Sequence, residues 1–553
     1  MIERAASGKS AGQKPNWRFF YWAWVVVLFA WAAWQRFALP LDPIADLDTW
    51  GYLAPALRKL VGAEFGHTYG RNFVYPGFVF LLLRVFGDFR AIVIAQHLLG
   101  LLAAGLWLFT WKRARIFVPD SRLSRPGHDS LGLLAATVFL WAGEPMRCEM
   151  QLRPEGVCAF LVSLNLFFAF QFMACAFLEK RSWACVGYGI GSTCTSVMLA
   201  SVKPSFALLA IAALLPVGIF FCRRSWFRQK IALGTGAVIC AALLLLPEYY
   251  LSREDEVSRT FLPTSVFVTH ANLIRDQMAE DLESGAKVPY DRERLTRIHD
   301  ALKTEIAKSA AARPGHFWSL GFDPDYLMYA KSSIALQLRQ EFDHDVPALC
   351  AFYRFYYCRI WQERPFLVLK RVAQQMALFY SEMCPAYNRE KSLPLANQYA
   401  DGVFALSLEP YPELWTSYPP AVQFVDRIKL LAENAPVIRQ PFPIRITLSL
   451  LAGLYRPLLW VALALGAFAL VRPQLRRRLG WLAALVLFVY SYNAAGCLEV
   501  AVIHSLEVRR YATVQVFFTI AAQFFALWFF WEMASAIWGR EKIVSPANPR
   551  GQG

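Results

Sequence analysis

The chain has 553 residues, of which 56% are hydrophobic and 15% aromatic, and its formal net charge is +16. The apolar fraction exceeds the roughly 45–50% of an ordinary soluble domain, so it excludes a soluble globular protein and indicates a membrane protein. The basic excess lies in the termini and in short loops, because the long polar stretch 252–446 is nearly neutral. This distribution follows the positive-inside bias of membrane proteins and predicts no nucleic-acid partner.

Apolar segments recur along the chain and predict an all-α polytopic membrane protein with about ten transmembrane helices, each near the length that crosses roughly 30 Å of hydrocarbon. Residues 1–18 are basic but lead into an aromatic segment without a small-residue cleavage pattern, so the first span is expected to be retained. The predicted spans are 19–37, 91–111, 131–146, 156–176, 183–201, 205–222, 231–251, 448–471, 480–502 and 512–536.

Lys and Arg in short loops orient these spans, since such loops are usually cytoplasmic. The basic loops are 112–129, 180–181, 223–230 and 472–478. Placing them inside makes the N-terminus 1–18 and the tail 537–553 cytoplasmic. It places the first outer loop 38–90 and the insertion 252–447 outside. We therefore expect a multi-pass protein of the plasma (inner) membrane whose polar loops are mostly extracytoplasmic.

Two acids, Asp46 and Asp48, lie in the loop that follows the first span, at the level of the lipid headgroups. An acid there can act on a substrate whose tail lies in the bilayer and whose polar head lies outside. The alternative is a pair of solvated loop acids, with Asp48 capping the next helix. The segment 49–62 has one apolar side, typical of a helix on the membrane surface; it is formed by Trp50, Leu53, Leu57 and Leu60.

The apolar segment 73–87 tests this topology. It is about 15 residues long, which is short for a span, and it contains Pro76 and Arg84. If it crossed the membrane, the basic loops between residues 112 and 230 would move outside. We therefore predict an interfacial or re-entrant helix on the outer side.

The chain divides into a first membrane module (19–251), the insertion 252–447 and C-terminal membrane helices (448–536). Segments 265–285 and 291–315 of the insertion have helical periodicity with charged faces, so a mainly helical extracytoplasmic domain is expected. The cysteines form no Cys-x-x-Cys pair. A disulfide is one alternative, with at least one thiol left free, for the insertion cysteines Cys350, Cys358 and Cys384.

Several loose motifs recur in a fixed order along the first module. Asp-x-x-x-Tyr-x-x-x-Ala is followed by Tyr-Pro, by an apolar stretch ending in Phe-Gly and by Arg-Pro-Glu; these are Asp48, Tyr52 and Ala56, then Tyr75-Pro76, Phe86-Gly87 and Arg153-Pro154-Glu155. In this order and spacing the chain resembles the GT-C superfamily of integral-membrane glycosyltransferases, in particular protein O-mannosyltransferases and aminoarabinose transferases. The resemblance covers roughly residues 15–250 and, more weakly, the final spans, but not the insertion.

The resemblance implies a transferase that takes a sugar from a polyprenyl phosphate on the outer face, with inversion at the anomeric carbon. The acceptor would be a lipid, glycan or protein. In such enzymes a first-loop aspartate is the general base, which by position is Asp48. Asp46 is the second candidate, because this chain has Asp-Leu-Asp where many relatives have adjacent acids. A carboxylate suits this step because it can hydrogen-bond the incoming hydroxyl and take its proton.

Charged residues flank the fourth and fifth predicted spans. Glu149 and Glu155, on either side of Arg153, could orient the acceptor or hold a divalent cation such as Mg²⁺ or Mn²⁺, and no other cofactor is expected. The alternative for Glu155 is a helix N-terminus, where an acid is favourable anyway. Lys203 lies between two apolar runs, where an unpaired ammonium is costly. It is expected to bind a donor phosphate or to snorkel to the interface.

His504, Arg509, Arg510 and Tyr511 precede the last predicted span, where relatives often carry Arg-Tyr. The planar donor fork of arginine suits a phosphate leaving group. Cations on the outer side also run against the positive-inside bias, which favours phosphate binding here.

Two further pairs of polar residues lie before and inside apolar segments. His67 and Arg71 precede the segment 73–87 and could contact the donor phosphate or sugar, or belong to an ordinary polar loop. Gln96 and His97 lie inside the second predicted span and are expected to make hydrogen bonds between helices.

Two other functions remain open: a lipid or polysaccharide transporter (flippase), and a non-catalytic subunit of a surface-glycan assembly complex. The chain has no Walker-type loop and no Rossmann fingerprint, so ATP-driven transport and nucleotide-sugar chemistry lack visible machinery. A secondary transporter is expected to have paired broken spans and charges near mid-membrane. Here the charges gather at the outer ends of the spans, which favours the transferase.

Overall fold

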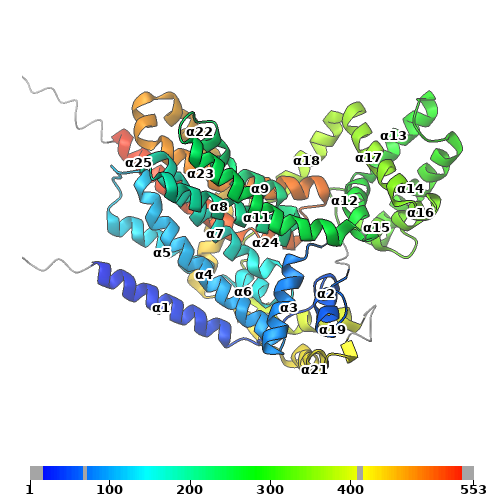
Figure 1. Ribbon diagram of the computed structural model, residues 1–553, viewed down its shortest axis with the longest axis horizontal. Coiled ribbons are helices and arrows are strands. Elements are labelled where there is room, and N and C mark those ends of the chain that lie inside the picture. Colours follow the sequence, from blue (N-terminus) through cyan, green and yellow to red (C-terminus); the bar gives the residue numbers. More distant parts are fainter. Residues whose placement is uncertain (1–16, 67–70, 254, 408–414, 539–553) are drawn as a thin grey trace, which may run out of the picture.

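The computed structural model describes residues 17–66, 71–253, 255–407 and 415–538, and these residues are mostly helical (Figure 1). Within them the strands form a single antiparallel pair, β1 (Ser392–Pro394) with β2 (Val437–Arg439). The predicted all-α class is therefore confirmed.

Eight helices of the described residues are long and apolar enough to cross a membrane. They are α1 (Trp17–Phe37), α4 (Arg90–Ala114), α7 (Glu155–Met173), α8 (Ser182–Val202), α11 (Phe227–Arg253), α22 (Phe442–Val471), α23 (Pro473–Ile503) and α25 (Val516–Trp538). A further candidate is the pair bent by 40° that includes α9 (Ala207–Ala213) and α10 (Leu215–Phe221). The chain is thus a polytopic membrane protein.

The predicted span 131–146 is not one helix. It falls across α5 (Arg125–Trp141) and the short α6 (Gly143–Met150), with extended backbone at Ala142. Pro145 explains the break, because a helix that continued through it would lack the hydrogen bond to the Trp141 carbonyl and would clash with that group. Helix α5 still packs inside the bundle, against α1, α4 and α25.

The bundle has two distinct ends. Helix α1 begins and α25 ends at the same end, at the left in Figure 1, and helices of the insertion protrude from the opposite end. We call this opposite end the insertion end.

The insertion contributes to two apolar cores. A protruding lobe has its own core and is built from α12 (Glu256–Thr269), α13 (Ala271–Ser284), α14 (Arg292–Ala312), α15 (Pro324–Tyr329), α16 (Ile334–Glu341) and α17 (Val346–Glu363). The remainder joins the core of the bundle and contains α18 (Pro365–Phe379), α19 (Ala396–Ser407) and α21 (Pro419–Asn434). All eleven cysteines are free thiols, so no disulfide joins these parts.

The first loop contacts the part of the insertion that joins the core of the bundle. Helix α2 (Trp50–Leu60) does not lie with its apolar side on a membrane surface, because Trp50, Leu53 and Leu57 are buried inside the protein. Trp50 donates a hydrogen bond to the Ala405 carbonyl at 3.2 Å, and its ring packs edge-on against that of Trp415. The membrane-surface interpretation of segment 49–62 is therefore wrong.

The segment 73–87 forms α3 (Val74–Phe86), which has 13 residues and is too short to span a membrane. It packs against α2, α4 and α8 at the insertion end. Glu248 of α11 accepts a hydrogen bond from the Phe73 N–H at 2.8 Å, which ties the start of α3 to the bundle. Helix α3 thus helps to fix the first loop over the ends of the membrane helices.

Candidate functional site

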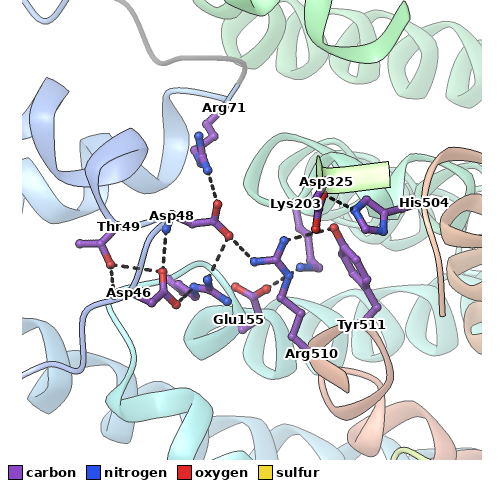
Figure 2. A network of polar contacts seen from close by, with 11 residues as sticks. Asp46, Asp48, Thr49, Arg71, Glu155, Lys203, Asp325, His504, Arg510 and Tyr511 are labelled. Atoms are coloured by element: carbon purple, nitrogen blue, oxygen red, sulfur yellow. Dashed lines mark hydrogen bonds and ion pairs between the residues drawn. The ribbon is translucent and has the colours of Figure 1, made fainter. Parts of the chain in front are cut away.

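The carboxylate of Asp48 is the centre of a polar network at the insertion end (Figure 2). Its Oδ1 accepts a hydrogen bond from Arg71 at 2.7 Å, and its Oδ2 accepts one from Arg153 at 3.0 Å. Oδ2 also contacts Arg510, in the short helix α24 (Arg509–Thr513). Three arginines from separate parts of the chain therefore converge on one acid.

The other first-loop acid, Asp46, has a local role. Its Oδ1 accepts the Asp48 N–H at 2.9 Å, and its own N–H donates to Thr49 Oγ1 at 2.8 Å. Its second oxygen pairs with Arg153. Asp46 thus forms the turn that opens α2, a position that the sequence had allowed for Asp48. This turn leaves the Asp48 side chain directed at the arginines.

The pKa values of the Asp46 and Asp48 carboxyls are shifted in opposite directions. Burial raises the pKa of Asp46, and Arg153 offsets only part of that rise. Burial acts in the same direction on Asp48, but Arg510, Arg153 and Arg71 together hold the pKa of that carboxyl well below its usual range. Asp48 is therefore ionised at neutral pH, with both oxygens engaged.

Lys203 and Glu155 form a second, buried pair in the same network. The Lys203 Nζ lies 2.6 Å from Glu155 Oε1, and the two side chains are only 8% and 6% exposed. Burial alone would lower the pKa of Lys203, but Glu155 raises it, so the ammonium stays charged. Lys203 also lies 5.3 Å from the centre of the Tyr511 ring. Its partner is a neighbouring acid, and it does not snorkel to the interface.

The protruding lobe reaches the network through Asp325, in the first turn of α15. His504 Nε2 lies 3.0 Å from Asp325 Oδ1, and the Ser505 N–H donates to His504 Nδ1 at 2.8 Å. We therefore assign the imidazole proton to Nε2, which donates to Asp325. The His504 ring in turn packs against Tyr511. Asp325 was not predicted from the sequence, because an acid in a first helical turn of the insertion is explained by helix stability alone.

Not all predicted residues join the network. Arg509 is 56% exposed and pairs with Glu144 at 3.2 Å and with Glu390 at 3.8 Å, away from Asp48. His67 lies outside the described residues. Those that the structure brings together are Asp46, Asp48, Arg71, Arg153, Glu155, Lys203, His504, Arg510 and Tyr511.

Glu149 lies in a separate buried cluster. It pairs with Arg36 of α1 at 2.7 Å and with His97 of α4 at 2.8 Å. Gln96, which precedes His97 on α4, donates to the backbone carbonyls of Glu149 and Gln151. The prediction that Gln96 and His97 make contacts between helices is confirmed.

Glu149 and Glu155 do not form the pair that the sequence predicts, because each carboxylate is paired with its own buried basic side chain. Among the described residues no group of three or more His, Cys, Asp and Glu side chains could hold a metal ion. The arrangement is instead rich in arginine and lysine, which are donors suited to phosphate.

Comparison with known proteins adds no family assignment: no family model, curated protein or solved structure matches the chain. The site is therefore interpreted from its own geometry.

The turn role of Asp46 leads to a testable difference between the two acids. Asp46→Asn keeps a side-chain oxygen that can accept the Asp48 N–H and loses only the pair with Arg153. If the protein is the glycosyltransferase that the sequence resemblance predicts, we expect sugar transfer to fall by less than about tenfold, because one partly exposed ion pair contributes about 1 kcal/mol or less. The measurement is kcat with a lipid-linked sugar donor. A loss as large as that of Asp48→Asn would show that Asp46 shares the role of base.

Proposed function

We propose that the protein is an integral-membrane glycosyltransferase of the GT-C type. It would transfer a sugar from a polyprenyl phosphate to a lipid, glycan or protein acceptor. One observation carries the proposal: the first-loop acid Asp48 lies among Arg71, Arg153 and Arg510, with Lys203 in the same network, where several membrane helices end. A base beside phosphate-binding cations, at the ends of membrane helices, suits a donor whose tail lies in the bilayer and whose sugar phosphate lies at the membrane surface.

In the proposed reaction the acceptor hydroxyl attacks the anomeric carbon of the donor sugar. The new C–O bond forms as the bond from that carbon to the phosphate oxygen breaks, and polyprenyl phosphate leaves with the electron pair. Asp48 takes the proton of the hydroxyl, and a single displacement inverts the configuration. Arg510 and Lys203 stabilise the negative charge that develops on the leaving phosphate.

The distribution of basic loops supports an extracytoplasmic site in the plasma (inner) membrane. Helix α7 begins at the site with Glu155, and its far end meets the loop of Lys180 and Arg181. There Arg113 pairs with Glu179 at 2.7 Å, and Arg223 donates to the Ala176 carbonyl. Basic loops that are expected to be cytoplasmic therefore gather at the end opposite the site.

The test is release of polyprenyl phosphate by the purified protein in detergent. The donors are undecaprenyl phosphates that carry a hexose, an amino sugar or a pentose, supplied with a cell-envelope extract as acceptor. Turnover with one donor class is expected. Movement of the intact donor across a proteoliposome membrane without release of polyprenyl phosphate would instead favour the transporter.

Adjacent arginines on α24 provide a matched pair of variants. Arg510→Gln removes a charged donor to the phosphate, and such hydrogen bonds contribute about 1.5–3 kcal/mol, so kcat/KM should fall about 10- to 100-fold. Arg509→Gln changes the neighbouring residue, which faces Glu144, and should have a much smaller effect. Equal losses in the two variants would contradict the assignment of Arg510 to the phosphate.

A further inference from the structure

The three arginines suited to a lipid phosphate all contact Asp48. Asp48 accepts from Arg71 and Arg153 and contacts Arg510. The group can still be reached from outside, because the side chains of Asp48, Arg71 and Arg510 are 30%, 23% and 34% exposed. The site thus has an internal anion where a substrate anion would bind.

A carboxylate and a phosphate use the same guanidinium donors. While both oxygens of Asp48 accept from arginines, the carboxylate is poorly placed to accept the proton of an acceptor hydroxyl. The arginines in turn cannot direct their full donor forks at a phosphate. Either the two anions share the arginines or one displaces the other.

We propose that Asp48 and the donor phosphate compete for one anion site formed by Arg71, Arg153 and Arg510, so that donor binding frees Asp48 to act as the base. This inference rests on the proposed function and adds the order in which its steps occur. The base becomes available only once the donor is in place.

We expect Arg510 to be the arginine that exchanges partners. Arg153 is held by Asp46 as well and is only 11% exposed, whereas Arg71 and Arg510 each lie over a tyrosine ring, that of Tyr52 at 5.0 Å and that of Tyr511 at 5.1 Å. Arg510 is the most exposed of the three, and its Nε is buried without a hydrogen-bond acceptor. It also lies on the same short helix as Tyr511, whose ring faces Lys203. A phosphate bound by Arg510 would therefore lie close to Lys203.

The test measures the Kd of undecaprenyl phosphate for the full-length protein in detergent, for wild type and for Asp48→Asn. Removing the internal anion should tighten binding about tenfold, which is about 1.4 kcal/mol. Undecaprenol, which lacks the phosphate, should bind both proteins equally. Inorganic phosphate should show the same tightening if the phosphate group alone is recognised, and none if the lipid tail is needed to deliver it.

Asp42→Asn is the matched control. Asp42 lies in the same loop and pairs with two arginines, Arg427 at 2.6 Å and Arg90 at 3.4 Å, but it is not part of the Asp48 network. This variant also frees two guanidinium groups, so it should leave the Kd of undecaprenyl phosphate unchanged. Equal tightening in both variants would reflect net charge and would overturn the competition.

An unchanged or weaker affinity in folded Asp48→Asn would also overturn the competition. It would leave the proposed function standing, because that proposal fails separately if wild-type protein releases no polyprenyl phosphate from any sugar donor.

Hydrogen exchange of the wild-type protein gives a readout without a variant. On addition of undecaprenyl phosphate, the peptide 44–53 should exchange faster and the peptide 509–513 more slowly. Protection of both peptides would contradict release of Asp48.

Discussion

Replacing Asp48 by asparagine should lower the kcat of sugar transfer about 10²- to 10⁴-fold, the range that a positioned general base contributes. The amide has nearly the same shape as the carboxylate, but it cannot take the proton of the acceptor hydroxyl. The measurement is the rate of polyprenyl phosphate release at saturating donor and acceptor.

The same variant separates catalysis from binding. If Asp48 competes with the donor phosphate, Asp48→Asn should bind donor more tightly while it turns over more slowly, so KM and kcat both fall. Thermal unfolding in detergent gives the control for folding. Transfer at the wild-type rate by folded Asp48→Asn would show that another group is the base.

Glu149→Gln should destabilise the protein by about 3 kcal/mol or more, because it leaves a buried cation without its counter-charge. The Arg36 side chain is fully buried, and Glu149 accepts from it through both carboxylate oxygens. The His97 ring also loses its charged partner. The free energy of unfolding in a mixed-detergent titration checks this expectation.

A surface acid provides the comparison for Glu149. Glu390 is 56% exposed and pairs with Arg509 at 3.8 Å, so Glu390→Gln should change stability by about 1 kcal/mol or less. If Glu149→Gln is as stable as the wild type but loses transfer, Glu149 is a functional residue and its buried cluster is not mainly structural.

Much of the site could be expected from the sequence because charge near a membrane is costly. Asp48, Glu155, Lys203 and Arg510 stand out as charged residues at the ends of apolar segments, where an unpaired charge is unfavourable. The structure shows that they lie in one network. The partners within it were not predictable, since spacing along the chain does not say which cation meets which acid.

Other features depend on tertiary structure. The sequence shows that α2 has an apolar side, but periodicity does not reveal whether lipid or protein covers it. In the structure Trp415 and Ala405 contact Trp50 on that side. Arg509 and Arg510 are adjacent in sequence yet face different acids, Glu144 and Asp48, because neighbouring residues of a helix point in different directions. Asp325 comes from the distant lobe, which no local pattern connects to the first loop.

The most direct test of the competition between Asp48 and the donor phosphate is a structure of the protein bound to undecaprenyl phosphate. We expect the phosphate within hydrogen-bonding distance of Arg510 and close to Lys203, with Asp48 released from Arg510 and open to an acceptor hydroxyl. A phosphate bound away from this network, with all three arginines still on Asp48, would contradict it.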